Sequence, residues 1–209
     1  MPRIKDNATA EGRQRHLAKY QRILDAALEI FADRGFHAAK ISEIARLAEV
    51  ADGTIYLYFK NKDDLLLSLL ESKLAAMNDG LRAELAAIAE PRERLGHIIA
   101  FHLRQASDNP TLARFVTLEM RRSSHSLPEA ARGRLADYLG QWTAVIEAGK
   151  AAGAIRPDVR TDVLQGMLYG ALDQACVTWM SRSERQASEL DVVASHLRTM
   201  LFSAVSAGS

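Results

Sequence analysis

Apolar residues recur every three to four positions along almost the whole 209-residue chain. This spacing places one apolar stripe on each α-helix, whereas a half-buried β-strand alternates apolar and polar residues. The chain has no sustained alternating run rich in Val, Ile, Thr and aromatic residues. The sequence therefore predicts an all-α fold of about nine helices.

Residues that start and stop helices divide this pattern into segments. Gly35 ends a first helix that we expect over about residues 13–34. Two short helices follow, over about residues 41–48 and 52–58. A long fourth helix then carries Asp63 and Asp64 in its first turn, where acidic side chains suit the helix dipole. The predicted domains are residues 1–62, ordered from about residue 13, and residues 63–209.

The two short helices and the turn Glu49-Val50-Ala51 between them have the pattern of a helix-turn-helix DNA-binding unit. The second short helix would enter the major groove, where Gly53 permits close approach to the duplex. Thr54 can donate to a phosphate or contact a thymine methyl group, and Tyr56 can reach the DNA backbone. The alternative is a small helical bundle without DNA contacts, because short helices with Gly and Tyr are common there too.

The segment from Arg22 to Leu66 resembles the DNA-binding signature of the TetR family of bacterial transcriptional regulators. The motif that carries the resemblance is IA, then V, then GT-I-Y-YF-NK, between Ile44 and Lys62. The resemblance implies that Thr54, Tyr56 and Lys62 hold phosphates and that Asp52 and Gly53 lie nearest the bases. The full set of expected DNA-binding residues is Lys40, Ser42, Asp52, Gly53, Thr54, Tyr56, Tyr58 and Lys62.

Two residues depart from the family's usual pattern. Lys40 stands where the family usually caps the second helix with Thr or Ser, so we expect a lost cap and a gained phosphate contact. Glu49 replaces the usual glycine of the turn, so we expect a positive φ at a residue with a side chain, which is uncommon. Glu49 also places a negative charge near the DNA.

The net charge of +1 is unevenly distributed along the chain. Residues 1–62 carry eleven Lys and Arg against eight Asp and Glu, whereas the remainder is slightly acidic. The mild excess lies where phosphate contacts are needed. On its own it is only a weak indication of DNA binding.

Patterns typical of catalysis or metal binding are missing from the sequence. It contains no pairing of nucleophile and base, HExxH run, Gly-rich phosphate loop or Cys/His cluster, and His97 and His102 do not share a helix face. The single cysteine, Cys176, excludes an internal disulfide and has apolar helical neighbours that favour core packing. We therefore expect a protein that is not an enzyme and holds no cofactor or metal.

The sequence also argues against a membrane or secreted protein. No stretch approaches the roughly 18 uninterrupted apolar residues that span a bilayer. The N-terminus is polar and lacks the apolar core of a signal peptide. We expect a cytoplasmic protein with no membrane partner.

TetR-like proteins use the C-terminal domain for ligand binding and for homodimerisation, the latter mainly through the last two helices. Apolar stripes in the last two predicted helices, about residues 162–181 and 189–205, match this arrangement. The alternative role of these stripes is the core of a single subunit, and part of them must serve that role. The expected dimerisation residues are Leu164, Leu168, Ala171, Leu172, Val193, Leu197 and Leu201.

About 70 residues of the C-terminal half resemble, more loosely, the acyl-CoA-responsive subgroup that represses fatty-acid degradation genes. The resemblance rests on residues 118–121, 138–139, 155–157 and 170–179. A long acyl chain needs an apolar tunnel, and the phosphates of coenzyme A need cations at its mouth. The expected effector-binding residues are Phe101, Phe115, Leu118, Met167, Gly170 and Trp179 around the tunnel, Arg104, Arg121 and Arg122 for phosphates, and Asp173 and Gln174 for a polar group. Solvated arginines and internal polar contacts are the alternatives.

These features lead to the hypothesis of a homodimeric repressor that binds palindromic double-stranded operator DNA. Long-chain acyl-CoA is the expected effector and releases the protein from genes of fatty-acid degradation. One alternative is a multidrug- or aromatic-compound-sensing repressor of the same fold. A second is an acyl-CoA-binding protein with a vestigial DNA domain, suggested by Glu49 and the weak net charge.

Overall fold

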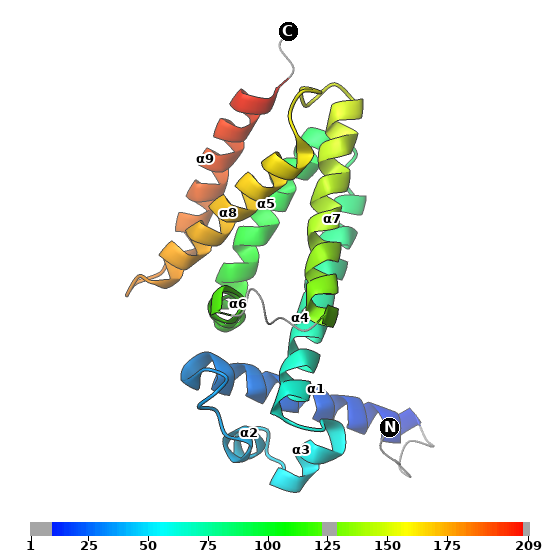
Figure 1. The fold of residues 1–209 in the computed structure, drawn as a ribbon, viewed down its shortest axis with the longest axis vertical. Coiled ribbons are helices and arrows are strands. Elements are labelled where there is room, and N and C mark those ends of the chain that lie inside the picture. The colour runs from blue at the N-terminus through cyan, green and yellow to red at the C-terminus, as the bar shows by residue number, and fades with distance from the viewer. Residues whose placement is uncertain (1–9, 123–128, 207–209) are drawn as a thin grey trace. The chain divides into compact units, whose positions relative to one another are not determined.

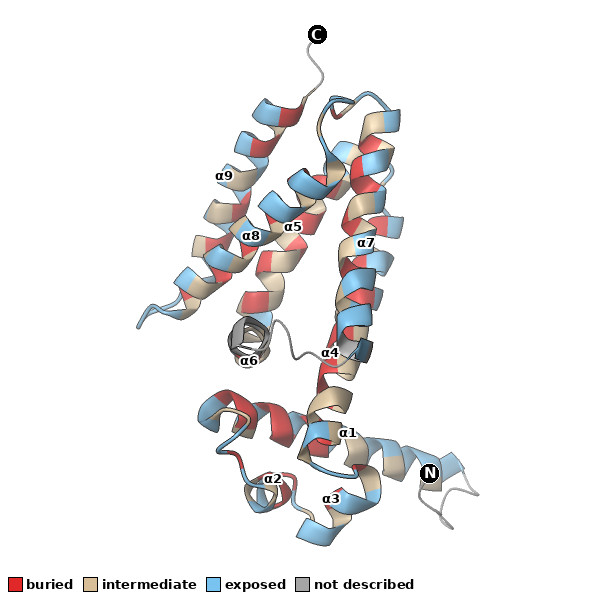
Figure 2. Cartoon of the chain, in the orientation of Figure 1, coloured by how far each residue is buried: buried red, intermediate tan, exposed pale blue. Residues whose placement is uncertain are grey.

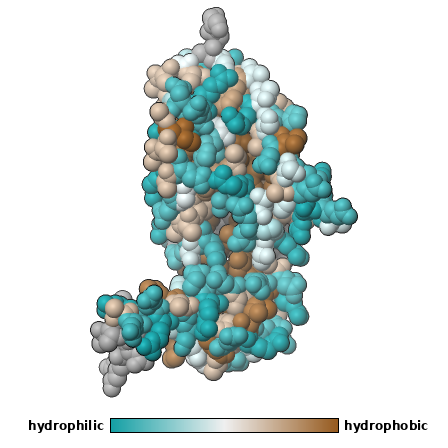
Figure 3. Space-filling view, turned by 180° about the vertical axis from the view of Figure 1, so that it is seen from behind, coloured by the Kyte–Doolittle hydropathy of each residue, from teal (hydrophilic) through white to brown (hydrophobic). Residues whose placement is uncertain are grey.

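The computed structural model describes residues 10–122 and 129–206, and within these ranges the chain forms nine helices and no strand (Figure 1). The all-α prediction is confirmed. The chain divides into two compact units, residues 1–73 and 74–209. No described helix is long and apolar enough to cross a membrane. On the face shown in Figure 3, hydrophilic side chains predominate in both units.

The first unit contains α1 (Ala10–Arg34), α2 (Ile41–Leu47), α3 (Asp52–Tyr58) and the first turns of α4 (Lys62–Ala86). Both α2 and α3 have seven residues, too few for a stable isolated helix. One apolar face of each is buried together with the stripe of α1 (Figure 2), whereas Leu47 and Leu57 are exposed. This core contains Ile23, Leu24, Ala27, Phe31, Ile44, Ala45, Ile55, Phe59, Leu65 and Leu69.

Helix α4 supplies residues to both units. The predicted domain boundary, between residues 62 and 63, lies at its start, whereas the compact units divide between Lys73 and Leu74. The first turns stay with the first unit because Leu65 and Leu69 are fully buried and Lys73 Nζ lies 2.7 Å from Asp25 Oδ1 of α1.

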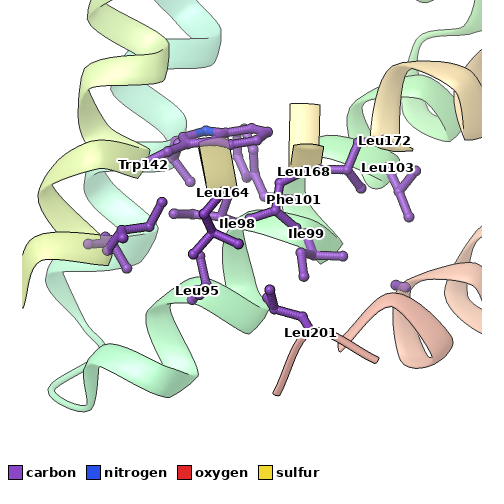
Figure 4. Close-up of a cluster of buried hydrophobic side chains, with 14 of the residues drawn as sticks. Leu95, Ile98, Ile99, Phe101, Leu103, Trp142, Leu164, Leu168, Leu172 and Leu201 are labelled. Atoms are coloured by element: carbon purple, nitrogen blue, oxygen red, sulfur yellow. The ribbon is translucent and has the colours of Figure 1, made fainter. Parts of the chain in front are cut away.

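The second unit is built around α5 (Pro91–Asp108). This helix packs against α6 (Pro110–Arg122), α7 (Glu129–Ala151), α8 (Thr161–Met180) and α9 (Ala187–Val205). Figure 4 shows the apolar cluster that results. It includes Leu95, Ile98, Ile99, Phe101 and Leu103 of α5, Trp142 of α7, Leu164, Leu168 and Leu172 of α8, and Leu201 of α9.

A buried amide network fixes α4 against α7 within the second unit. Asn78 is only 3% exposed, and its Nδ2 donates to the carbonyl oxygens of Leu74 and Arg134. Gln141 Nε2 completes the network by donating to Asn78 Oδ1 over 2.9 Å. Because a buried amide without partners is costly, this pairing specifies one register of the two helices.

The turn between α2 and α3 has the backbone conformation expected from its sequence. Glu49 has φ 55°, the one positive value at a non-glycine residue in the described chain. The turn is closed by hydrogen bonds from the Val50 N–H to the Ala45 carbonyl, 3.0 Å, and from the Ala48 N–H to the Ile44 carbonyl, 2.9 Å. The expected positive φ at Glu49 is confirmed, and it costs about 1 kcal/mol relative to glycine.

Replacing Glu49 by glycine should therefore stabilise the protein. We expect Glu49→Gly to raise the free energy of unfolding by up to about 1 kcal/mol, because relief of strain exceeds the added freedom of the unfolded chain. Urea denaturation followed by circular dichroism measures the change. Glu49→Ala removes the same charge but keeps the Cβ atom, so an equal gain in both variants would attribute the effect to charge instead.

Candidate DNA interface and effector site

Helix α3 has one buried face and one exposed face. Ile55 and Phe59, at most 2% exposed, anchor the helix in the first unit. Asp52, Gly53 and Tyr56 lie on the exposed side. A Cβ atom built on Gly53 would meet no other atom within 4 Å. The protein's own packing therefore does not require glycine here, whereas close approach of a duplex would.

Tyr58 and Thr54 are less accessible than their expected roles suggest. The ring of Tyr58 stacks on His16 of α1, with ring centroids 4.5 Å apart, and burial raises the pKa of its hydroxyl. Thr54 is half-buried near the start of α3, and its N–H donates to the Ala51 carbonyl over 2.8 Å. Tyr58 thus braces α3 against α1 in addition to any contact with DNA.

Lys62 has a bracing role that the sequence did not indicate. Its Nζ donates to the carbonyl oxygens of His37 and Ala39, both over 3.1 Å, and lies 4.7 Å from the ring centroid of Phe36. These contacts use two of the three ammonium protons. Lys62 therefore holds the α1–α2 loop against the start of α4, and its expected phosphate contact stays a prediction that the third proton leaves open.

The start of α2 confirms the loss of a side-chain cap at Lys40. An ammonium group has no acceptor for the free helical N–H groups, and no cap hydrogen bond is formed by this side chain. Part of the loss is offset by Glu43, whose carboxylate accepts the Lys40 backbone N–H over 3.2 Å. The side chains of Lys40 and Ser42 remain exposed.

Glu49 lies next to α1. Glu49 lines a hollow together with Arg22, Asp25 and Glu29, all three of which belong to α1. Glu49 is itself exposed, so the negative charge expected near the DNA stays a prediction.

Helix α8 has two stripes, and their burial is the reverse of what their expected roles require. Leu164, Leu168 and Leu172 are at most 3% exposed and form core, so they are not free to contact a second copy. Met167 is 55% exposed, and Gln174 is exposed as well. Successive residues turn by about 100° around a helix, so both stripes fit the same sequence pattern and only packing separates them.

The other residues expected at the dimer interface or the effector site are likewise split between buried and exposed positions. Leu201 is buried in the core and Gly170 is exposed, contrary to their expected roles. Ala171, Val193 and Leu197 are half-buried. Phe101, Phe115 and Trp179 are buried in the second unit, and their expected contact with a ligand stays a prediction.

The expected phosphate-binding arginines are only partly described. Arg104 lies 2.6 Å from Glu84 of α4 and stacks over Phe101, so its charge is already paired. Burial opposes ionisation of Glu84, but hydrogen bonds from Arg104 and His97 outweigh it and lower the pKa of this carboxyl group. The side chains of Leu118, Arg121 and Arg122 of α6 lie outside the described residues.

An aromatic cluster in the second unit was missed at the sequence level. His102 Nδ1 lies 3.2 Å from the Tyr138 hydroxyl, and its ring makes edge contacts with Trp142 and Tyr169. Desolvation lowers the pKa of His102 to about 4, although the nearby Asp173 opposes this shift. These residues come from three helices, so no local spacing could have grouped them. The sequence singled out Asp173 as a polar group for a ligand, but it did not connect Asp173 with His102, Tyr138 or Trp142.

The described residues contain no group of three or more His, Cys, Asp or Glu side chains able to hold a metal ion.

Two family models match the chain in succession. The model described as bacterial regulatory proteins, tetR family, matches residues 23–69. The model described as the C-terminal region of YsiA-like protein matches residues 70–204. Together they account for the helix-turn-helix and for most of the second unit.

Individual relatives match over nearly the full length. The fatty acid metabolism regulator protein of Bacillus subtilis is 33% identical over 80% of this chain and 86% of its own. Two solved structures are 31% identical and cover 88% of this chain. They are the fatty acid degradation regulator FadR of Bacillus halodurans, with TM-score 0.80 over 97% of its chain, and a FadR of Bacillus subtilis in complex with stearoyl-CoA, with TM-score 0.81 over 98%.

The exposed Gly53 gives a test of the DNA interface. Gly53→Ala should leave the fold intact or stabilise it by up to about 1 kcal/mol, since alanine favours helix and the Cβ meets no protein atom. Operator affinity should fall about tenfold or more, because the methyl group would hold the helix away from the duplex. Gel-shift titration and urea denaturation measure the two quantities.

Gly140→Ala on α7 is the matched control, because a Cβ at this exposed glycine also meets no atom within 4 Å. It should leave operator affinity unchanged. If Gly53→Ala binds the operator as tightly as the parent protein, α3 is not the element that approaches the DNA.

Proposed function

The chain belongs to the tetR family of bacterial regulatory proteins, and we propose that it is a homodimeric repressor that long-chain acyl-CoA releases from palindromic operator DNA. The observation that carries the proposal is the likeness of both units to regulators of fatty acid metabolism. The genes it controls would accordingly be those of fatty-acid degradation.

DNA binding is assigned to the exposed side of α3. Gly53 and Tyr56 are accessible there, while Ile55 and Phe59 hold the helix in the core. A two-fold dimer would place two copies of α3 about 34 Å apart, one turn of B-DNA, which corresponds to a palindromic operator. Lys40 and Ser42, exposed at the start of α2, would contact the phosphates beside it.

Dimerisation is assigned to the outer face of α8 and α9, defined by Val163, Met167, Val192 and Met200. Each of these side chains is 55–60% exposed. They are the large apolar side chains that are exposed in the described part of the second unit. Burial of such a face against a second copy would remove apolar surface from water and stabilise the pair.

Control by the ligand requires that one state of the protein bind it better than the other. Helix α4 is continuous from Lys62 to Ala86 and supplies residues to both units. A ligand that displaces α7 would disturb the amide network of Asn78 and Gln141, and hence α4. The displacement would change the spacing of the two α3 helices and weaken operator binding.

The proposal is tested by gel-shift titration of the protein's own promoter fragment with palmitoyl-CoA, coenzyme A and palmitate. We expect palmitoyl-CoA to release the DNA at micromolar concentrations and coenzyme A alone to have no effect. Operator affinity should also fall steeply with salt, as for phosphate-contacting proteins. If no acyl-CoA alters DNA binding, acyl-CoA is not the effector. A screen of aromatic compounds would then test the drug-sensing alternative.

The outer face of α8 and α9 can be tested separately from DNA and ligand. Met167→Glu should convert the dimer to a monomer, because a carboxylate buried in an apolar interface is not compensated. Light scattering coupled to size exclusion measures the mass. Ala144→Glu adds the same charge at an exposed position of α7 and should remain dimeric. A dimeric Met167→Glu protein would exclude this face as the interface.

A further inference from the structure

The indole nitrogen of Trp142 is a buried donor without a well-formed hydrogen bond. Trp142 is fully buried, and its Nε1 forms no hydrogen bond of acceptable geometry with any described residue. Buried N–H groups are nearly always paired, because leaving one unpaired costs free energy. Trp179, the other tryptophan, shows the ordinary case: its Nε1 donates to the Gln186 carbonyl over 3.0 Å. The Tyr138 hydroxyl lies close enough to this indole for the two groups to interact, but no hydrogen bond of good geometry joins them, so Trp142 can still donate to a better placed acceptor.

A second donor lies beside this nitrogen. The rings of His102 and Trp142 meet edge to face, with centroids 5.6 Å apart. His102 and Tyr138 share one hydrogen bond, 3.2 Å long. A neutral imidazole and a phenol carry two such protons between them, and their mutual bond uses only one. Whichever group donates, one proton remains for another acceptor.

The charge of this cluster is also defined. His102 is neutral at physiological pH because desolvation lowers its pKa to about 4, and burial raises the pKa of Tyr138 and of the Cys176 thiol. Asp173 is the acidic group whose charge acts on His102 and Cys176. The cluster therefore offers neutral donors next to a negative charge and no cation. An uncharged oxygen acceptor suits it, and a carboxylate does not.

We propose that Trp142 and the His102–Tyr138 pair hydrogen-bond the carbonyl oxygen of the acyl thioester and so select acyl-CoA over free fatty acid. The inference rests on the proposed function and specifies its ligand site. A carbonyl oxygen has two lone pairs and accepts from two donors. The surrounding apolar cluster, including Phe101 and Leu172, takes the adjoining methylene groups. Selection arises because a fatty acid would bring an uncompensated carboxylate to the same place.

The experiment compares palmitoyl-CoA with S-hexadecyl-CoA by isothermal titration calorimetry. The second compound is a thioether that keeps the chain and the coenzyme but lacks the carbonyl oxygen. The wild-type protein should bind palmitoyl-CoA about tenfold more tightly, as expected for one net hydrogen bond to a buried donor. Palmitate should bind more weakly than either compound.

Trp142→Phe should abolish this preference, and Tyr138→Phe should reduce it. Trp179→Phe is the matched control, because it removes an indole whose N–H is already paired, and it should keep the preference. The ratio of two affinities within one variant is insensitive to a general loss of packing, and circular dichroism confirms that each variant is folded.

Two results would overturn the inference and leave the repressor proposal intact. One is equal binding of the two compounds by the wild-type protein, and the other is an undiminished preference in Trp142→Phe. A wild-type protein that binds neither compound would overturn the inference together with the acyl-CoA effector of the proposed function.

Discussion

The reading of DNA by this protein depends on one constraint, which is that α2 and α3 are too short to be stable alone. Each has seven residues, and neither has a side-chain cap at its first turn. Their position comes from burial of Ile44, Ile55 and Phe59 under α1 and from the turn at Glu49. Lys62 adds to this by holding the loop before α2 through two carbonyl groups. The exposed residues of α3 are thus presented by a rigid core and not by helix propensity.

In the second unit, polar groups are buried within an apolar core and therefore need hydrogen-bond partners. Asn78 is satisfied by two carbonyls and by Gln141, and this arrangement fixes α4 against α7. Trp142, on the same helix as Gln141, is left with an unpaired indole N–H. The aromatic cluster thus keeps hydrogen-bonding capacity that the neighbouring amide network does not have. A ligand bound there would act on α7, and α7 is joined to α4.

Helix α8 shows how a family resemblance can identify a helix correctly and its faces wrongly. Leucines at positions 164, 168 and 172 look like an interface stripe, and Met167 looks like part of a tunnel. The core takes the leucines because they are the bulkier and more continuous stripe, and the glycines and Met167 face outward. The outward face, less apolar in composition, is consequently the one available to a second copy.

The sequence alone determined the helices, the helix-turn-helix and the unusual backbone at Glu49, because these depend on local spacing and on the residue at one turn position. The tertiary structure decided which stripe of α8 faces the core, since one sequence pattern fits two helical phases. It also decided the bonding of Lys62 to carbonyl groups 23 and 25 residues away. The tertiary structure likewise decided the cluster of His102, Tyr138, Trp142 and Tyr169. Its members lie on three helices, and only the packing of those helices brings their rings together.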